Sequence, residues 1–192
     1  MPLMEPFATN LDLQTGVIQP AEPVVKRRLS DMRRLFADAE AVEQILAAEG
    51  DRLIYEVYPV NIPDEEGHAP YSTTIIYPGR VGDEYHMTKG HFHERRGYAE
   101  VYIGLAGEGY LLLQSGEGAV RAVPMRAGTV AYVPPFWAHR TANTGDAPFV
   151  FLAVWPGAAG HDYGAIAQIG FARLLVARDG RPTLVDNPRY GG

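Results

Sequence analysis

The sequence predicts an all-β barrel or sandwich with a small helical region near its N-terminus. From Asp51 onward, short segments alternate apolar and polar residues, as half-buried strands do. Turn-forming clusters rich in Gly, Ser, Asn and Asp, such as residues 115–118 and 143–146, separate these segments. Regularly spaced short strands between such turns are typical of sandwiches and barrels. Three histidines and one glutamate also fall where the side chains of different strands could meet inside a barrel.

The first fifty residues precede this strand pattern. Residues 1–28 contain several prolines and little periodicity, so we expect an extended N-terminal arm. Residues 30–48 carry apolar side chains at the helical period, with Ser30 as the expected N-cap and Gly50 as the end. Asp38 could cap a second turn, which would give one broken helix packed outside the sheet.

The remaining chain should form a barrel over residues 51–176, with a C-terminal hairpin over residues 171–186. Asp179-Gly180 favours the tight turn of that hairpin. No internal repeat or linker divides the chain, so we expect a single domain over residues 1–192. The expected strands are 52–60, 72–77, 84–93, 98–105, 109–114, 119–125, 129–133, 139–143, 148–155, 171–177 and 183–185.

Composition limits the classes of function. The 192 residues are 46% hydrophobic, which is ample for one core. The net charge of −6 and the lack of a long basic run argue against nucleic-acid binding. There are no cysteines, so any metal must take imidazole and carboxylate ligands. The sequence contains no apolar run long enough for a membrane span and no secretory pattern, so we expect a cytoplasmic protein.

The histidines suggest a metal site. On a strand, His91 and His93 point to the same face, and Glu100 follows on the next expected strand. His139 could supply a fourth ligand from a distant strand. Such a set suits Fe²⁺, Mn²⁺, Zn²⁺, Ni²⁺ or Co²⁺, and Fe²⁺ is our first expectation. The alternative is a group of core histidines satisfied by hydrogen bonds in an ordinary sandwich.

The spacing of the whole pattern resembles the two motifs of the cupin superfamily. Six residues separate His93 from Glu100, and six more separate Glu100 from Gly107. The second motif contains Gly128, Pro134, His139 and Asn143, separated by five, four and three residues. This resemblance implies a double-stranded β-helix, which is a jelly-roll-like barrel whose walls meet at a metal.

A closer resemblance is to the archaeal-type cupin phosphoglucose isomerases. It rests on the segments TKGHFH (88–93), EVY (100–102), YVPPFWAHRTANTG (132–145) and GHDYG (160–164), and extends upstream to LSDM (29–32) and YEVY (55–58). The resemblance implies a homodimer that interconverts glucose 6-phosphate and fructose 6-phosphate with a divalent metal. The implied metal ligands are His91, His93, Glu100 and His139. The implied phosphate contacts are Tyr55, Thr74, Thr88 and Gly90, and the other implied polar groups of the active site are Tyr102, His161 and Tyr163.

The residues themselves suggest how such a reaction would proceed. Glu100 is the carboxylate in the motifs that could carry a proton between C1 and C2 through an enediol, although a hydride shift is the competing route. A metal near the sugar oxygens would act as a Lewis acid. His161 is not needed as a ligand, so it could open the sugar ring as an acid or base. The hydroxyls of Thr73, Thr74 and Thr88 and the Gly90 amide could hold a phosphate without a basic patch.

The sequence departs from the pattern of this family at two places, and two other functions are still compatible with it. Trp155 stands where the family would have a tyrosine, and Arg95-Arg96 could be a surface loop or an extra phosphate contact. A cupin dioxygenase could use the same three histidines and glutamate around Fe²⁺, but it has no general need for phosphate donors. A non-catalytic sugar-binding or storage cupin would not need all four ligands together with His161.

Overall fold

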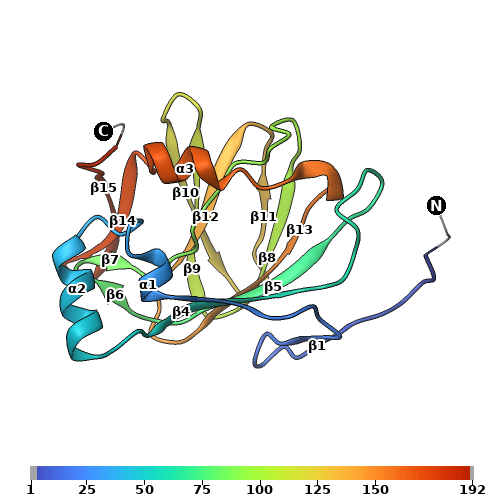
Figure 1. Ribbon diagram of the computed structural model, residues 1–192, viewed down its shortest axis with the longest axis horizontal. Coiled ribbons are helices and arrows are strands. Elements are labelled where there is room, and N and C mark those ends of the chain that lie inside the picture. The colour runs from blue at the N-terminus through green and yellow to red at the C-terminus, as the bar shows by residue number, and fades with distance from the viewer. Residues whose placement is uncertain (1–3, 191–192) are drawn as a thin grey trace.

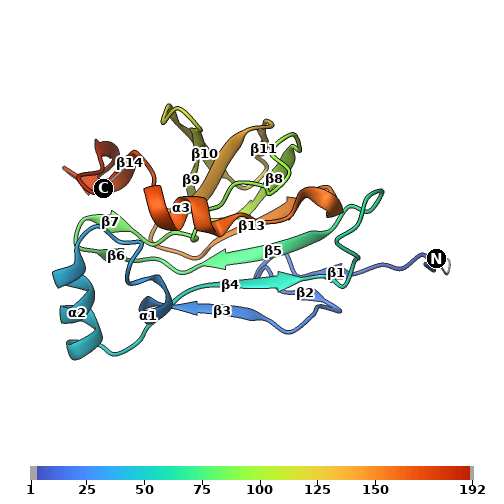
Figure 2. The ribbon, with the colours of Figure 1, turned by 45° about the horizontal axis from the view of Figure 1, so that its top comes forward.

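The computed structural model describes residues 4–190, and strands dominate this part of the chain. Figure 1 shows the strands gathered into a barrel, and Figure 2 shows β3, β4 and β5 in one layer below the remaining barrel strands. All strand pairings in the described residues are antiparallel. The all-β cupin barrel expected from the sequence is therefore confirmed.

Two sheets form the walls of the barrel. The six-stranded sheet has the order β11 (Val130–Val133), β8 (Glu100–Ala106), β13 (Phe149–Val154), β5 (Tyr71–Ile76), β4 (Leu53–Pro59) and β3 (Val25–Arg28). The three-stranded sheet has the order β10 (Val120–Arg126), β9 (Glu108–Ser115) and β12 (Trp137–Asn143).

Two smaller sheets flank these walls. One has the order β15 (Arg181–Asp186), β14 (Arg173–Arg178), β7 (Glu84–Tyr85) and β6 (Arg80–Val81), and the other pairs β1 (Asn10–Leu11) with β2 (Ile18–Gln19). The expected C-terminal hairpin is present between β14 and β15. Its two-residue turn has positive φ at Asp179 (51°) and Gly180 (70°), as a type I′ turn requires.

The core lies between the inner faces of the two walls. Ile76 and Phe149 from the six-stranded sheet and Leu111 from the three-stranded sheet are fully buried. Each such side chain stabilises the fold by about 1.5–3 kcal/mol through the removal of apolar surface from water. The interior also contains buried polar side chains, and His93, Glu100 and His139 among them belong to the site described below.

The N-terminal arm differs from the expectation. Its last residues form β3, which pairs antiparallel with β4 and extends the six-stranded sheet. Earlier residues form the small β1–β2 hairpin. The prediction of an extended arm over residues 1–28 was therefore wrong for residues 25–28, because β4 would otherwise leave an open sheet edge that a further strand can cover.

The helical region is broken, as its sequence allowed. It consists of α1 (Leu29–Met32) and α2 (Ala39–Ala48), which lie outside the strands (Figure 1). Asp38 caps α2 by accepting a hydrogen bond from the Ala41 amide at 2.9 Å. Ser30 is not an N-cap, since it lies inside α1 and its amide and hydroxyl both donate to Asp51 at 2.8 Å. No helix in residues 4–190 is both long and apolar enough to span a membrane.

The segment expected as one strand over residues 84–93 is interrupted. Only β7 is a regular strand, and beyond it the chain pairs through single bridges at Met87–Ala142, His91–His139 and Phe92–Asp162. Gly90 has a φ of 75°, which breaks the extended path between these bridges. The sequence pattern also missed the short helices η1 (Gly157–Ala159) and α3 (Tyr163–Ile169).

Candidate metal centre

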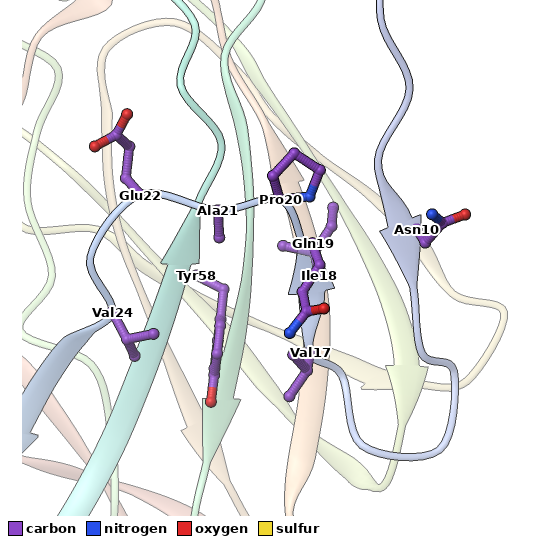
Figure 3. A pocket seen from close by; sticks show the side chains of 9 residues that line it. All are labelled: Asn10, Val17, Ile18, Gln19, Pro20, Ala21, Glu22, Val24 and Tyr58. Atoms are coloured by element: carbon purple, nitrogen blue, oxygen red, sulfur yellow. The ribbon is translucent and has the colours of Figure 1, made fainter.

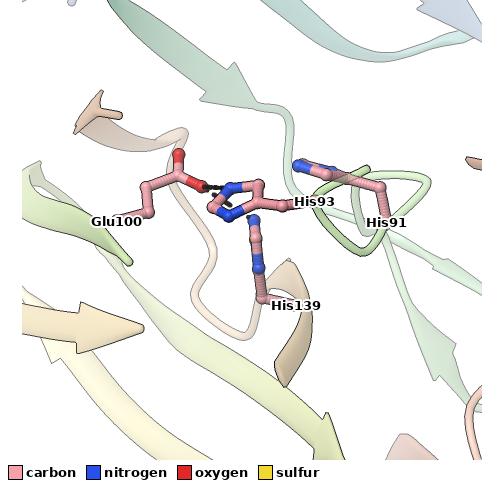
Figure 4. Close-up of side chains that lie close together, drawn as sticks. All are labelled: His91, His93, Glu100 and His139. Carbon is pink, nitrogen blue, oxygen red and sulfur yellow. Dashed lines mark hydrogen bonds and ion pairs between the residues drawn. The ribbon is translucent and has the colours of Figure 1, made fainter. Parts of the chain in front are cut away.

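Three chain segments bring the expected ligands together. Glu100 begins β8, His139 lies on β12, and His91 and His93 lie in the bridged segment before β8. The backbones of His91 and His139 exchange two hydrogen bonds of 3.1 and 2.9 Å, so their side chains start from neighbouring positions. Figure 4 shows the four side chains pointing toward one another. We call His91, His93, Glu100 and His139 the metal cluster.

The geometry of the metal cluster fits a bound ion. Its four candidate ligand atoms all lie within 4.8 Å of one another, and all four residues are buried. Glu100 Oε2 lies 3.1 Å from His93 Nε2 and 2.9 Å from His139 Nε2. The second approach lacks hydrogen-bond geometry, so the buried Nε2 atoms of both His139 and His91 have no hydrogen-bond partner. Buried nitrogens of this kind are costly unless something binds them, and a divalent ion held by imidazole and carboxylate would do so.

The backbone orients two of these rings. His93 Nδ1 lies 3.1 Å from the Tyr98 carbonyl oxygen, and His139 Nδ1 lies 3.4 Å from that of Trp137. A ring whose Nδ1–H donates to a carbonyl presents Nε2 as the free ligand atom, which is a common arrangement around protein-bound metals. The sequence could not reveal these carbonyl contacts, since they depend on the path of the loop and strand.

Charge and burial act in opposite directions in the metal cluster. Burial would raise the pKa of Glu100, but the charge of His139 at 2.9 Å and the hydrogen bond from His93 hold that pKa well below its usual range. Burial, with the neighbouring His139 and His161, lowers the pKa of His91 well below its ordinary value. Burial would also lower the pKa of His93, yet its hydrogen bond to Glu100 raises it. The cluster thus favours an ionised carboxylate beside at least one neutral imidazole.

A cavity of about 490 Å³ opens beside the metal cluster. Its volume is in the range of small-molecule sites. Every expected site residue except His93 lines it: Tyr55, Thr74, Thr88, Gly90, His91, Glu100, Tyr102, His139, His161 and Tyr163. Thr73, which the sequence offered as a further donor, does not line it in the structure. Strand alternation on β5 places Ser72 and Thr74 toward the cavity and Thr73 on the opposite face.

Aromatic rings of the cavity lie next to the histidines of the metal cluster. The His161 ring lies 4.6 Å from the His91 ring and stacks on Tyr163 at 5.9 Å, measured between centroids. Tyr102 lies 5.7 Å from the His139 ring and stacks on Phe151 at 5.1 Å. Burial lowers the pKa of His161 and raises that of Tyr102 well above its usual value. His161 can therefore act as a neutral base, while Tyr102 keeps its proton.

The turn at Thr88-Lys89-Gly90 offers hydrogen-bond donors to the cavity. The Thr88 hydroxyl accepts a hydrogen bond of 3.1 Å from the Thr141 amide, which leaves its own proton free to donate. A Cβ on Gly90 would lie 2.9 Å from Arg140 Cβ, so only glycine fits this close approach at positive φ. Arg140 Nη2 donates to the Lys89 carbonyl at 2.8 Å, and this hydrogen bond stabilises the backbone of the segment over residues 88–90.

Arg95 and Arg96 do not line the cavity. Arg95 Nη1 pairs with Glu66 at 3.1 Å on the surface, and Arg96 Nη2 pairs with Asp162 at 3.0 Å. Asp162 also caps α3 by accepting from the Ala165 amide. Arg96 therefore fastens the segment that carries His161 and Tyr163. Of the two alternatives left open for this arginine pair, its position favours the surface loop over an extra phosphate contact.

Sequence reasoning missed several residues that line the cavity. Arg27 and Lys89 bring positive charge to it, and Asp64 brings a carboxylate. Trp155 also lines it, and its buried Nε1 has no hydrogen-bond partner within residues 4–190. Arg27 had no local signal, because the sequence Val25-Lys26-Arg27-Arg28 does not alternate apolar and polar residues, and its half-buried position appears only once β3 pairs with β4.

A second cavity, of about 530 Å³, lies beside the β1–β2 hairpin and Tyr58 of β4 (Figure 3). Its lining includes Asn10, Gln19 and Glu22 but no histidine. It therefore lacks a group suited to transition-metal binding or to acid–base work near neutral pH. The chemistry of the described chain is concentrated in the cavity beside the metal cluster.

Comparison with known proteins decides the family. A family model described as glucose-6-phosphate isomerase matches residues 26–190 of this chain. The chain belongs to the glucose-6-phosphate isomerase family. The glucose-6-phosphate isomerase of Pyrococcus horikoshii is 51% identical to it over 186 residues, which are 97% of each chain. That of Thermococcus litoralis is 50% identical over 190 residues, 99% of each chain.

A relative with lower sequence identity also has the name glucose-6-phosphate isomerase. The glucose-6-phosphate isomerase of Sinorhizobium medicae is 39% identical over 178 residues, which cover 93% of this chain and 83% of that protein. Among solved structures, an oxalate decarboxylase matches 53% of this chain and 26% of its own, with 25% identity and a TM-score of 0.44. The relatives confirm the resemblance seen in the sequence motifs.

Proposed function

We propose that this protein is a metal-dependent aldose–ketose isomerase that interconverts glucose 6-phosphate and fructose 6-phosphate. The observation that carries the proposal is the metal cluster at the wall of a cavity lined by neutral phosphate donors. Membership of the glucose-6-phosphate isomerase family supports the same reaction. A sugar phosphate needs both features, because one end of the molecule is an anion and the other must react.

The donors of the cavity would bind the phosphate. The hydroxyls of Tyr55, Thr74 and Thr88 and the amide of Gly90 all line the same cavity. Burial raises the pKa of Tyr55 to about 12, so its hydroxyl stays protonated and able to donate. Burial likewise raises the pKa of Tyr163, which keeps a further donor near the sugar. Hydrogen bonds to a charged acceptor are worth about 1.5–3 kcal/mol each, enough to orient the substrate.

Glu100 would move the proton between C1 and C2. Its Oε2 already contacts two histidines, which leaves Oε1 for proton transfer. Its pKa lies well below the usual range, so it is ionised at neutral pH, which is the state that a base requires. Tyr102 lies on the same strand face and could donate to the sugar oxygens as the enediol forms. A shift of hydride from C2 to C1 is the competing route, and it would need no base at Glu100.

His161 would open the sugar ring before isomerisation. Its ring lies beside His91 and stacks on Tyr163, so it faces the space where the sugar would lie. A buried histidine whose pKa is lowered can accept the proton of the ring hydroxyl at neutral pH. Tyr163 would position this imidazole through the stacking contact.

The metal cluster would hold a divalent ion, and we propose Fe²⁺, with Mn²⁺, Zn²⁺, Ni²⁺ and Co²⁺ as substitutes. The ion would supply Lewis-acid stabilisation of negative charge on the sugar oxygens. The ligand set supports this choice, because imidazole and carboxylate suit these ions better than Ca²⁺ or a thiolate-preferring ion.

We also propose that the protein acts in glycolysis and gluconeogenesis in the cytoplasm, and as a homodimer. Exposed apolar side chains support self-association, since Val130, Tyr132 and Phe136 are 69%, 60% and 65% exposed. Clustered apolar residues at a surface commonly mark protein interfaces. Light scattering at micromolar concentration should give twice the mass of one chain, and the mass of a single chain would contradict the dimer.

A coupled assay tests the reaction. Purified protein is incubated with fructose 6-phosphate, and glucose 6-phosphate is measured after treatment with chelator and after addition of each metal. We expect turnover that chelator abolishes and added Fe²⁺ restores. Oxygen uptake is followed in the same cuvette, because a dioxygenase would consume O₂. Absence of glucose 6-phosphate with every metal would contradict the proposal.

A further inference from the structure

Arg27 lies on β3, the strand that joins the barrel sheet from the N-terminal segment. Along β3, Val25 and Arg27 are half-buried, whereas Lys26 and Arg28 are exposed. The register places Arg27 opposite Tyr55 and Val25 opposite Val57 on β4. All four of these paired residues line the cavity beside the metal cluster. One face of the β3–β4 pair, visible at the lower edge of Figure 2, therefore forms a wall of the site.

Of the three successive cations on β3, Lys26 pairs with a carboxylate, whereas the side chains of Arg27 and Arg28 contact backbone carbonyls. Lys26 Nζ pairs with Glu56 at 3.0 Å, and Arg28 Nη1 donates to the Asp51 carbonyl at 2.7 Å. Within residues 4–190, Arg27 has no carboxylate partner within 4 Å, and its Nη1 donates a hydrogen bond of 3.2 Å to the adjacent Lys26 carbonyl. A half-buried guanidinium without a counter-ion can still bind an anion with high selectivity.

Arg27 acts on the phosphate donors rather than on the metal cluster. Its positive charge lowers the pKa of both Tyr55 and Tyr163, against the larger effect of burial, which raises them. Burial and then the charge of Arg27 lower the pKa of Lys89, so these two cations lie near each other. Arg27 therefore lies near Tyr55 and Lys89 in the wall of the cavity, and its charge also reaches Tyr163.

The two carboxylates of the cavity do not cancel this charge. Glu100 contacts His93 and His139 in the metal cluster. Asp64 is close enough to His161 to act on its pKa, which places it toward the acid–base end of the cavity. Neither carboxylate therefore forms an ion pair with Arg27.

We propose that Arg27, assisted by Lys89, binds the phosphate dianion of the substrate and makes the site selective for phosphorylated sugars. The proposal rests on the isomerase function proposed above and adds to it a residue from outside the cupin motifs. Neutral donors alone would bind a sugar hydroxyl almost as well as a phosphate oxygen. A guanidinium without a counter-ion gains strongly only from the charged group, so it is Arg27 that would distinguish the two.

Four proteins test this inference: wild type, Arg27→Gln, Arg27→Lys and Arg28→Gln. Arg28 is the matched control, because it is the same residue type on the same strand but points away from the cavity. KM and kcat for fructose 6-phosphate are measured with metal-loaded protein. Binding of inorganic phosphate is measured by titration calorimetry with metal-free protein, which gives a readout independent of turnover.

We expect Arg27→Gln to raise KM and the phosphate dissociation constant by about 10- to 100-fold, as for the loss of one hydrogen bond to a charged group. Its kcat should stay close to that of wild type, because uniform binding is removed while the reacting end is untouched. Arg27→Lys should recover part of the affinity, and Arg28→Gln should leave both values unchanged.

The outcomes separate this inference from the function on which it rests. Wild-type turnover of fructose 6-phosphate with an unchanged KM in Arg27→Gln overturns the role of Arg27 and leaves the isomerase standing. Arg27-dependent binding of inorganic phosphate without any turnover supports the anion site and contradicts the isomerase. Equal losses in Arg27→Gln and Arg28→Gln would show a general effect on β3 and overturn the inference.

Discussion

Two groups of buried polar residues in the barrel can be compared. One is the metal cluster, and the other, which we call the β7–β12 cluster, lies between those strands. Both are almost entirely shielded from water, and both contain atoms without a hydrogen-bond partner. The β7–β12 cluster consists of Glu84, His86, Arg140 and Asn143.

The two groups differ in where their polar atoms point. In the metal cluster, four ligand atoms converge on one point beside a cavity. In the β7–β12 cluster, the side chains contact separate backbone groups instead of a common point. Glu84 accepts a hydrogen bond from the Ala37 amide, and His86 contacts the Tyr77 carbonyl. Arg140 donates to the Lys89 carbonyl, and Asn143 donates to the Ile76 and Ala147 carbonyls. Unpartnered atoms alone therefore do not identify a ligand site. A ligand site is identified by several polar atoms that point toward one position. Polar side chains that each bond a different backbone group instead stabilise the contacts between segments of the fold.

The largest expected effect comes from removing a ligand of the metal cluster. His91→Ala, His93→Ala and His139→Ala should each lose most of the bound metal and the activity while keeping a folded barrel. The reason is that each imidazole is one of four groups around a single point. Metal analysis of the purified proteins, with circular dichroism to confirm folding, checks this.

His86→Ala is the matched control from the β7–β12 cluster. It also removes a buried histidine, but one whose Nδ1 contacts the Tyr77 carbonyl rather than the metal cluster. We expect its metal content to match wild type, although its stability should fall. Wild-type metal content in all three ligand variants would contradict the assignment of the site.

The second expected effect concerns Glu100→Gln. This variant keeps the shape of the side chain but removes the base, so turnover should fall by about 10²–10⁴-fold, as for the loss of an acid or base group. Fructose 6-phosphate incubated with wild type in deuterated water should give glucose 6-phosphate with deuterium at C2. Glu84→Gln, the control from the β7–β12 cluster, should keep near-normal turnover.

A hydride shift predicts a different result for the same pair of measurements. The migrating hydrogen would never exchange with solvent, so the product would contain no deuterium. A shielded site could also return the proton before exchange, which makes the Glu100→Gln rate the deciding value. Metal-replete Glu100→Gln with near-normal turnover, and no deuterium in the wild-type product, would rule out the proton shuttle.

A third prediction tests the fastening role of the β7–β12 cluster. Asn143 Nδ2 donates to the Ile76 and Ala147 carbonyls at 2.8 and 2.9 Å, and Asn143 is fully buried. Asn143→Ala leaves these carbonyls without that donor, at about 1–3 kcal/mol for each buried group. Urea unfolding should show this loss of stability, whereas metal content per folded protein should not change. Unchanged stability would show that the carbonyls find other donors.

The smallest expected effect is on the pH dependence of stability. Burial raises the pKa of Glu84 to about 6 and lowers that of His86 to about 4. The stability due to His86 is full above its unfolded pKa of about 6.5 and is lost as the pH falls toward 4. The stability due to protonated Glu84 is full below about 4.5 and is lost as the pH rises through 6. Between pH 6 and 4.5 the two residues therefore oppose each other.

Glu84→Gln removes the carboxyl group whose protonation stabilises the fold as the pH falls. On moving from pH 6 to pH 4.5, the variant should lose more stability than wild type, by about 1 kcal/mol. A shift of about 1.5 pKa units corresponds to about 2 kcal/mol in total, and only part of that change falls between the folded and unfolded pKa values. Urea unfolding of both proteins in chelator, at several pH values, measures the difference directly. Identical pH dependence in the two proteins would show that Glu84 does not take up a proton on folding in this range.

The sequence by itself determined the features that depend on local pattern. Strand alternation, turn residues and the Asp179-Gly180 hairpin were enough to predict the barrel, because these signals act within a few residues. The spacing of His91, His93, Glu100 and His139 likewise predicted the metal cluster. The spacing assigns each ligand to an expected strand, even when the pairing of those strands is unknown.

Only the tertiary structure decided the features that depend on pairing between distant segments. β3 adds Arg27 to the cavity because it pairs with β4, and the segment over residues 84–93 is interrupted because successive residues bridge to different partners. His86 and His139 are both buried, yet one contacts the Tyr77 carbonyl and the other belongs to the metal cluster. Periodicity gives the face of a strand on which a side chain lies, whereas long-range pairing decides what that face meets.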